Sequence, residues 1–244
     1  MIERQVAITT PDGAMNTFVC HPERGGPYPV ILFFMDAPGI REELRDMARR
    51  IVSVGYYVLL PNLYYRSGVE ELGAFTGEAG APVRARLMEL MGGLTIPMVM
   101  SDADALVAFA DADAAASKGP MGALGYCMSG RYAISAAARH RDRVTVAASI
   151  YGTNLITEKD DSPHLAARRA KARFYVACAE IDHYFPLEMV EPLRDSLRAG
   201  GVDAEVELYP GVEHGFAFPR RPAYNKPAAE RHWERLFALF AALN

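Results

Sequence analysis

The sequence predicts an α/β fold in which a mostly parallel sheet carries helices on both of its faces. Two observations support this fold class. Apolar runs of strand length, such as residues 29–35 and 56–60, contain no charged side chain, which is typical of strands covered on both faces. Segments with apolar residues at helical spacing follow these runs, and the regular alternation indicates strand-helix-strand units.

The N-terminus is predicted to form a β-hairpin ahead of these units. Residues 3–9 alternate between polar and apolar side chains, as a half-buried strand does. Pro11, Asp12 and Gly13 form a turn, and residues 15–21 return to an extended segment.

The helices of the first half are predicted from apolar spacing and from their ends. Residues 41–54 place apolar side chains at helical spacing, and Gly55 ends this helix. Residues 63–80 are rich in glycine, so we expect an irregular surface excursion near the site. Helices are then expected over residues 83–91 and 97–114. The second should carry four aspartates on its solvent side: Asp102, Asp104, Asp111 and Asp113.

The second half of the chain continues the alternation of strands and helices. Strands are predicted at residues 121–124, 144–151, 172–179 and 202–209. Helices are predicted at residues 132–139, 164–170, 187–199 and 228–243. Because no linker or internal repeat divides the sequence, we expect one domain over residues 1–244.

Composition excludes several classes of protein. The chain has 244 residues and a net charge of −4, and no basic cluster suggests a nucleic-acid partner. No apolar run reaches membrane-spanning length, and the first residues lack the apolar core of a signal peptide. The three cysteines are too scattered for a disulfide framework or a zinc site. We therefore expect a cytoplasmic protein without cofactor, metal or membrane contact, and a monomer or weak homo-oligomer.

The stretch from Gly125 to Gly130 has the pattern of a nucleophile elbow, in which a buried strand turns sharply into a helix. Cys127 lies at the tip of this turn, between Gly125 and the small residues Ser129 and Gly130. Small residues there let the strand and helix backbones approach closely. The turn strains the nucleophile, and the helix N-terminus favours a thiolate and later an oxyanion.

This stretch is open to two interpretations besides the elbow with Cys127 as nucleophile. A cysteine in an apolar run is often a buried structural residue. The glycine frame and the partners downstream favour a nucleophile instead. Ser129 departs from the glycine usual at its position but is small enough to preserve the turn, and it lies too far into the helix to be the nucleophile itself.

Two further residues with catalytic chemistry follow later strands, where functional groups of parallel sheets collect. Asp182 follows the strand at residues 172–179, and His214 follows the last strand. An imidazole at His214 can accept the thiol proton of Cys127 and later return it to a leaving group. A carboxylate at Asp182 would fix the imidazole tautomer. The order nucleophile, acid, histidine is that of the α/β-hydrolase fold.

These motifs resemble those of the dienelactone hydrolase family, the cysteine branch of the α/β-hydrolases. Gly125-Tyr126-Cys127 matches the family elbow, and His214-Gly215-Phe216 matches the family histidine loop. Residues 36–40 and 55–64 closely follow the block after the first central strand of the family. The resemblance covers nearly the whole chain and implies a hydrolase that acts on small-molecule esters or lactones.

The resemblance also implies further site residues. The family has a glutamate where Asp36 stands, and that carboxylate holds the resting thiol and helps to deprotonate it. Asp36 keeps the charge with a shorter reach, or it is simply a turn or helix-cap residue. The oxyanion hole would consist of the backbone N–H groups of Met128 and Ala37. Members that cleave dienelactone bind its carboxylate partly with a serine and an arginine, where this chain has Gly215 and Phe218.

Candidate residues for the substrate pocket are aromatic or basic. They are Tyr126, Tyr151, Phe216, Phe218, Arg84 and Arg86. Residue type favours core packing for each aromatic ring and a solvated surface charge for each arginine over a role in the pocket. Other arginines that could replace the lost carboxylate anchor are Arg66, Arg220 and Arg221. Among the other histidines, His183 should point away from the pocket, and the rest are expected at the surface: His21, His140, His164 and His232.

The sequence therefore predicts an ester or lactone hydrolase with a triad of Cys127, His214 and Asp182 that forms a thioester with the acyl group. Cleavage of a different acyl ester or a phosphoryl ester is one alternative. A non-catalytic ligand-binding or redox-sensing protein on the same fold, with Cys127 as a reactive thiol, is another. The presence of both Asp182 and His214 argues against the second alternative, because sensing needs no triad.

Overall fold

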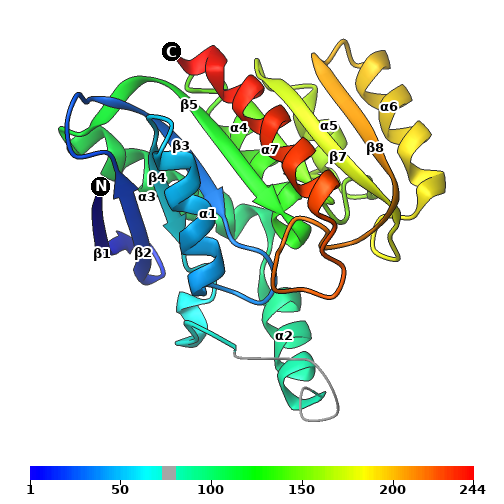
Figure 1. Cartoon of the computed structure of the whole chain (residues 1–244), viewed down its shortest axis with the longest axis horizontal. Coiled ribbons are helices and arrows are strands. Elements are labelled where there is room, and N and C mark those ends of the chain that lie inside the picture. Colours follow the sequence, from blue (N-terminus) through cyan, green and yellow to red (C-terminus); the bar gives the residue numbers. More distant parts are fainter. Residues whose placement is uncertain (73–80) are drawn as a thin grey trace. The chain divides into compact units, whose positions relative to one another are not determined.

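The computed structural model describes residues 1–72 and 81–244, and the described part of the chain forms an α/β fold with eight strands (Figure 1). Its residues cluster into two compact units, Met1–Lys118 and Gly119–Asn244. The predicted excursion at residues 63–80 falls partly outside the described residues. The expected single domain over residues 1–244 stays a prediction.

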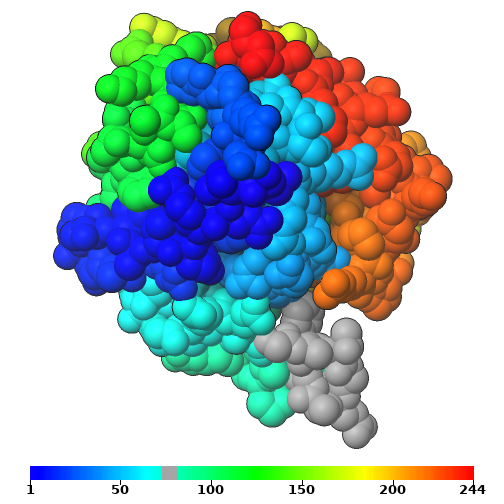
Figure 2. Space-filling view, turned by 60° about the vertical axis from the view of Figure 1, so that its left-hand side comes forward, coloured from blue at the N-terminus to red at the C-terminus, as the bar shows by residue number. Residues whose placement is uncertain are grey.

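The four strands of the first unit follow the order β1-β2-β4-β3. Their bounds are Ile2–Thr10 for β1, Gly13–His21 for β2, Tyr28–Phe34 for β3 and Tyr57–Pro61 for β4. Strands β1 and β2 pair in antiparallel register and confirm the predicted hairpin. The hairpin lies at the surface of this unit, where Figure 2 shows it in dark blue. Strand β4 pairs antiparallel with β2 and parallel with β3.

The helices of the first unit lie close to where apolar spacing predicts them. Their bounds are Glu42–Val52 for α1, Ala81–Gly93 for α2 and Ile96–Ala112 for α3. Thr95 caps α3 by accepting the N–H of Met98, which satisfies one of the first backbone donors of the helix. No single helix in the described ranges is long and apolar enough to cross a membrane, although α2 and α3, bent by 79°, pass that test together.

Asp102 corrects the expectation that the aspartates of α3 face solvent. Its side chain is fully buried, and its two oxygens accept hydrogen bonds from the Arg66 guanidinium at 2.8 and 2.9 Å. The Tyr65 hydroxyl donates a third bond, at 2.9 Å. A buried carboxylate is stable only with such partners. The prediction was wrong because both partners lie in a turn more than thirty residues away, which the spacing within α3 does not reveal.

The second unit contains four parallel strands in the order β5-β6-β7-β8. Their bounds are Ala116–Tyr126 for β5, Val144–Ile150 for β6, Arg173–Ile181 for β7 and Ala204–Glu213 for β8. Parallel strands bring their carboxyl ends to the same edge of the sheet. The residues that directly follow these four strands are Cys127, Tyr151, Asp182 and His214.

Helices cover both faces of the sheet in the second unit. Their bounds are Gly130–Arg139 for α4, Pro163–Ala167 for α5, Val190–Ala199 for α6 and Lys226–Phe240 for α7. Figure 1 shows α7 in front of these strands and α4 behind them, and both helices contact β6. Most of β6 and β7 is thus removed from water, which explains the nearly continuous apolar runs of these two strands.

Strand β8 extends further than its sequence pattern predicts. The prediction ended it at Tyr209 and placed Pro210 and Gly211 in a loop, whereas the strand continues to Glu213. The pairing with β7 shifts register near this point, so the strand accommodates a proline without an intact ladder. Gly211 has a φ of +66° and donates its N–H to the Glu180 carboxylate at 2.6 Å. The irregular strand end carries the chain directly to the histidine loop.

Candidate active site

Cys127 lies at the tip of a sharp strand-to-helix turn, as the sequence predicts. Its φ is 54°, in the left-handed region that non-glycine residues rarely occupy. A Cβ atom at Gly125 would collide with the backbone of Ser129, and one at Gly130 would collide with Ser149 and Gly152. The turn therefore requires both glycines, while Ser129 is buried without disturbing it.

The loop after β6 holds the elbow from one side. Tyr151 has a φ of 37°, and the backbone turns there toward α4. The N–H of Thr153 then donates to the carbonyl oxygen of Cys127 at 3.1 Å. The strained conformation of the nucleophile candidate is thus fixed by a second loop at the same sheet edge.

The loops after β7 and β8 bring Asp182 and His214 together. Asp182 Oδ2 lies 2.8 Å from His214 Nδ1. The other carboxylate oxygen accepts the backbone N–H groups of Tyr184 and Phe185 at 2.8 and 3.2 Å, which fixes the carboxylate plane. The backbone N–H of His214 donates to the carbonyl oxygen of Ile181 at 3.1 Å, so the histidine loop is bound to the end of β7.

The imidazole of His214 is buried between two charged or chargeable groups. Burial opposes its protonation, but the hydrogen bond and charge of Asp182 and the influence of Cys127 outweigh this and raise the pKa of His214 to about 9. Asp182 occupies Nδ1, and Nε2 is buried without a hydrogen-bond partner among the described residues. The raised pKa favours the protonated form of the ring, which the Asp182 carboxylate stabilises.

The three cysteines differ in exposure. Cys127 is partly exposed, whereas Cys20 and Cys178 are buried. Burial raises the pKa of Cys20 to about 11 and that of Cys178 to about 12. A thiolate is the reactive form of cysteine, so these two buried thiols are poor nucleophiles at neutral pH.

Four aromatic residues proposed for the pocket lie in one buried cluster. They are Tyr126, Tyr151, Phe216 and Phe218, and each is at most 1% exposed. The Tyr151 ring lies 4.9 Å from the His214 ring, edge to face, and the Tyr126 ring lies 5.3 Å from Phe218. The cluster supports the core-packing interpretation, and its rings lie against the loop that carries His214. A role in contacting substrate stays a prediction.

Sequence reasoning missed two residues around this site. Tyr184, on the loop that also carries Asp182, is exposed, and its ring packs edge to face with His214 at 4.9 Å between the ring centres. His232, expected at the surface, is fully buried, and the Tyr126 hydroxyl lies 3.0 Å from its Nε2. The position of His232 on the apolar face of α7, beside Trp233 and one turn before Leu236, was the available signal.

The other histidines can also be compared with expectation. His21 is buried and stacks on the ring of Tyr57 at 5.2 Å, so its expected surface position was wrong. His140 and His164 are partly buried. His183 is exposed, in line with the expectation that it points away from Asp182 and His214.

Asp36 lies in the first unit, where Arg41 holds its carboxylate through two hydrogen bonds of 2.5 and 3.1 Å. Asp36 is fully buried, and its carbonyl oxygen accepts the N–H of Gly39 at 3.0 Å in a turn. Burial disfavours the charge of Arg41, but Asp36 and Glu43 raise its pKa. Arg41 was not predicted as a partner, and this pair supports the turn-forming role of Asp36.

The remaining candidates are described within their own units. The carbonyl oxygen of Ala37 accepts the Tyr64 hydroxyl at 2.7 Å, and Met128 is buried directly after Cys127. Their joint oxyanion role stays a prediction. On α2, Arg86 pairs with Glu89 at 2.6 Å on the surface, which supports the solvated-charge interpretation. The guanidinium of Arg221 lies 5.1 Å from the centre of the Phe218 ring.

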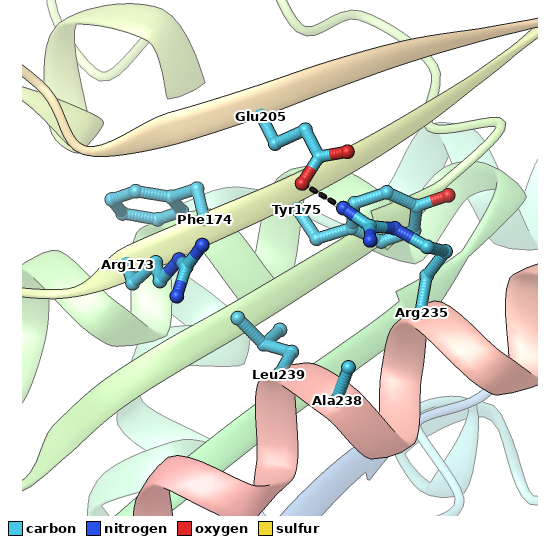
Figure 3. Close-up of a pocket in the computed structure, with 7 residues that line it drawn as sticks. All are labelled: Arg173, Phe174, Tyr175, Glu205, Arg235, Ala238 and Leu239. Carbon is cyan, nitrogen blue, oxygen red and sulfur yellow. Dashed lines mark hydrogen bonds and ion pairs between the residues drawn. The ribbon is translucent and has the colours of Figure 1, made fainter.

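Two hollows in the second unit lie away from the predicted catalytic residues. Figure 3 shows a cavity of about 70 Å³ beside the first residues of β7, across which Arg235 pairs with Glu205. A second hollow, of about 320 Å³, is lined by Thr145 and Arg173 at the starts of β6 and β7. Cys127, Asp182 and His214 line neither of them. In the described part of the chain, no three His, Cys, Asp or Glu side chains gather in a way that could hold a metal ion.

Comparison with known proteins gives consistent matches over nearly the whole chain. The model of the dienelactone hydrolase family matches residues 15–244. A protein of Methylorubrum extorquens named "Putative carboxymethylenebutenolidase" is 29% identical over 240 residues, which cover 97% of this chain and 79% of the relative. One of the same name from Escherichia coli (strain K12) is 29% identical over 230 residues, 93% of this chain and 82% of that protein.

Solved structures agree with these matches. The crystal structure described as a "Putative Dienelactone Hydrolase" from Klebsiella pneumoniae superposes with a TM-score of 0.87, at 24% identity, over 98% of each chain. A dienelactone hydrolase-like promiscuous phosphotriesterase from metagenomic libraries gives a TM-score of 0.79 at 20% identity, over 99% of this chain and 98% of that one. Likeness at these identities shows the fold, which is the predicted α/β-hydrolase fold.

Proposed function

This chain belongs to the dienelactone hydrolase family and is a hydrolase, and on that premise we propose that it cleaves a carboxylic ester or lactone through Cys127, His214 and Asp182. The observation that carries this proposal is the hydrogen-bonded pair of Asp182 and His214, which follows two parallel strands at the same sheet edge as the strained turn of Cys127. The carboxylate lies 2.8 Å from one ring nitrogen, and Asp182 and Cys127 together raise the pKa of His214 to about 9.

The first half-reaction transfers the acyl group to sulfur. A protonated His214 beside Cys127 balances the charge of a thiolate, and the thiolate attacks the carbonyl carbon of the substrate. The backbone N–H groups of Met128 and Ala37 are proposed to stabilise the resulting oxyanion. The tetrahedral intermediate then expels an alkoxide, which takes the proton from His214 Nε2. The products of this step are a thioester on Cys127, an alcohol and a neutral imidazole.

The second half-reaction returns the enzyme to its starting state. Neutral His214 accepts a proton from water as the water oxygen attacks the thioester carbon. Collapse of the second intermediate releases the carboxylic acid and regenerates the thiolate beside a protonated imidazole. Asp182 stays ionised throughout, keeps His214 in the orientation that points Nε2 toward Cys127, and stabilises the imidazolium form.

Asp36 has two proposed roles in this scheme. One is that of the family glutamate, whose carboxylate controls the resting thiol. The other is to hold the turn that carries Ala37, by pairing with Arg41. The two-pronged pair with a guanidinium supports the second role, because a carboxylate bound in this way is not free to accept a proton from a thiol.

The substrate is proposed to be a neutral and moderately apolar small molecule. Gly215 and Phe218 stand where the family members that cleave dienelactone carry a serine and an arginine, and Phe218 is buried among aromatic rings. An apolar ring cannot pair with a substrate carboxylate. The location in the cell and the oligomeric state also stay predictions.

The assignment of the nucleophile is tested by alkylation. A short pulse of iodoacetamide should label Cys127 before Cys20 and Cys178, because only Cys127 is partly exposed and the other two have pKa values of about 11 and 12. Hydrolysis of an aryl ester should be lost in parallel with this label, as followed by mass spectrometry and initial rates. Early labelling of Cys20 or Cys178 with parallel loss of activity would contradict the assignment.

The test also separates hydrolysis from the rival functions. Cys127→Ala and Cys127→Ser should leave little turnover, since an alanine has no nucleophile and a hydroxyl has a far higher pKa than a thiol. A redox-sensing or ligand-binding protein would show no turnover of any ester before mutation. A screen over lactones, carboxylic esters and phosphotriesters would identify the class of substrate that is cleaved fastest.

A further inference from the structure

The side chain of His232 occupies a position that the triad does not explain. It lies on the buried face of α7 and is 0% exposed. Its Nδ1 faces the carbonyl oxygen of Ala229, which can only accept a hydrogen bond, so Nδ1 carries the proton. The Nε2 atom is then an acceptor, and the Tyr126 hydroxyl donates to it at 3.0 Å. This buried hydrogen bond joins residues 106 positions apart in the chain.

His232 also contacts the loop that carries the proposed base. Its ring packs edge to face with the ring of Phe216, with 6.1 Å between the ring centres and an interplanar angle of 86°. Tyr126 directly precedes Cys127, and Phe216 follows His214 by two residues. One buried imidazole therefore touches both the nucleophile elbow and the histidine loop.

We propose that His232 and Tyr126 form a positioning pair that sets the alignment of Cys127 with His214. Tyr126 is the last residue of β5, so its ring, once fixed by the bond to His232, fixes the backbone from which the strained turn at Cys127 starts. The edge-to-face contact with Phe216 holds the histidine loop against the same ring. Neither side chain reacts with substrate. The inference rests on the proposed function, because it concerns the geometry of that triad.

The chemistry of the pair explains why a histidine stands at this position. A hydroxyl that is buried without a partner is costly, so the Tyr126 O–H needs an acceptor inside the core. A neutral imidazole supplies one acceptor and satisfies its own N–H on the carbonyl of Ala229. A phenylalanine at residue 232 would fill the space but leave the Tyr126 hydroxyl without this acceptor, so the ring of Tyr126 would be held less firmly.

The test uses His232→Phe, Tyr126→Phe, the double variant and His232→Gln. We expect each single phenylalanine variant to lower kcat about tenfold with KM nearly unchanged, because small misalignments of reacting groups are expensive. The double variant should be no slower than the slower single one, since both remove the same hydrogen bond. His232→Gln keeps an acceptor and should recover most of the rate. His21→Phe, at a buried ring stacked on Tyr57, is the matched control and should keep wild-type kcat.

Alkylation of Cys127 distinguishes positioning from a merely structural role. If the pair sets the alignment, the pH dependence of iodoacetamide labelling of Cys127 should shift in His232→Phe and Tyr126→Phe but not in His21→Phe. Wild-type kcat and a wild-type labelling profile in both phenylalanine variants would overturn the inference, even if their melting temperatures fall. If His232→Phe does not fold, Tyr126→Phe decides, because it removes only one oxygen atom.

The same experiments separate this inference from the proposed function. A Cys127→Ala variant that still hydrolyses the ester would overturn the proposed triad itself. An inactive Cys127→Ala variant, together with fully active His232→Phe and Tyr126→Phe variants, would overturn only the positioning pair.

Discussion

Two buried aspartates, one in each unit, show how a partner determines what a carboxylate can do. The side chain of Asp36 is 0% exposed and that of Asp182 is 1% exposed, and both follow closely on a parallel strand. Asp36 is held by the guanidinium of Arg41, and Asp182 by the imidazole of His214. Burial and position in the fold are therefore nearly the same, and the partners differ.

The difference between the partners is one of proton chemistry. A guanidinium does not give up its proton in the pH range of ordinary enzyme chemistry, so Arg41 cannot exchange a proton with Asp36. An imidazole gains and loses a proton near neutral pH, so the pair of Asp182 and His214 can support proton transfer. The comparison predicts that changes to Asp36 act mainly on stability, and changes to Asp182 mainly on the rate.

Removal of the titratable partner should have the largest effect. His214→Ala takes away the proposed base and acid. We expect kcat/KM for an aryl ester to fall by an amount that corresponds to a loss of roughly 3 to 6 kcal/mol in transition-state stabilisation. His183→Ala is the control, because His183 is exposed in the same loop as Asp182. Steady-state kinetics of both variants measure the difference. An equal loss of kcat/KM in the two variants would contradict the assignment of His214 as the base.

Neutralising Asp182 should cost somewhat less. Asp182→Asn keeps the shape of the side chain but no longer stabilises the protonated ring. We expect kcat to fall by an amount that corresponds to an increase of about 3 to 4 kcal/mol in the activation free energy. The loss of stability should stay below the loss of rate. It is limited to the roughly 3 kcal/mol that the raised pKa of His214 supplies, because the amide oxygen still accepts the N–H groups of Tyr184 and Phe185. A variant with normal kcat and reduced stability would show that Asp182 stabilises the fold, as proposed for Asp36, and does not support catalysis.

The matching change at Asp36 should have the opposite profile. Asp36→Asn removes the carboxylate charge that faces the largely buried Arg41, and we expect the free energy of unfolding to fall by about 3 kcal/mol. Denaturant unfolding measures this loss. Asp142→Asn, in an exposed pair with Lys171, is the control and should leave stability unchanged. If Asp36→Asn keeps full stability and instead changes the alkylation rate of Cys127, the family-glutamate role is supported.

Raising the pH should weaken the fold through His214. Its pKa is about 9 in the folded chain against an ordinary value of 6.5, so the folded state holds the proton more tightly. The resulting stabilisation is complete below pH 6.5 and is lost as the pH rises through 9, at a cost of up to about 3 kcal/mol. Unfolding of the wild type and of His214→Ala at pH 6 and 10 isolates this contribution. The same pH dependence in both proteins would contradict the raised pKa.

A substrate carboxylate would, like Asp36 and Asp182, need a partner of its own, so the choice of substrate sharpens the comparison. Gly215 and Phe218 after the histidine offer no charged partner to a substrate carboxylate. We therefore expect kcat/KM to be higher for a neutral aryl acetate or lactone than for dienelactone, by a factor that corresponds to about 2 kcal/mol. Parallel kinetics on both substrates give this ratio. A clear preference for dienelactone that is abolished by Arg84→Ala or Arg86→Ala would overturn the expectation and assign the anchor to α2.

The elbow, the order of the proposed triad and most strands and helices could be predicted from the sequence because local chemistry determines them. Glycine is needed where the backbones of a strand and a helix meet this closely. The structure shows that neither Gly125 nor Gly130 has room for a Cβ atom. Apolar runs and helical spacing placed the elements within a few residues. Strand β8 was the exception, because a register shift carries it through Pro210 and Gly211.

The partners of buried polar groups could be known only from the tertiary structure. The expected surface positions of Asp102 and His232 were wrong because Arg66 and Tyr126, 36 and 106 residues away, supply their hydrogen bonds in the core. Periodicity shows which face of an element is apolar, but a polar residue on that face is buried only if a distant segment brings a matching donor or acceptor. By itself the sequence determines which residues can do chemistry and at which strand ends they stand. Long-range packing determines the partner of each, because desolvation makes every buried charge or hydroxyl depend on a group that the fold alone brings near.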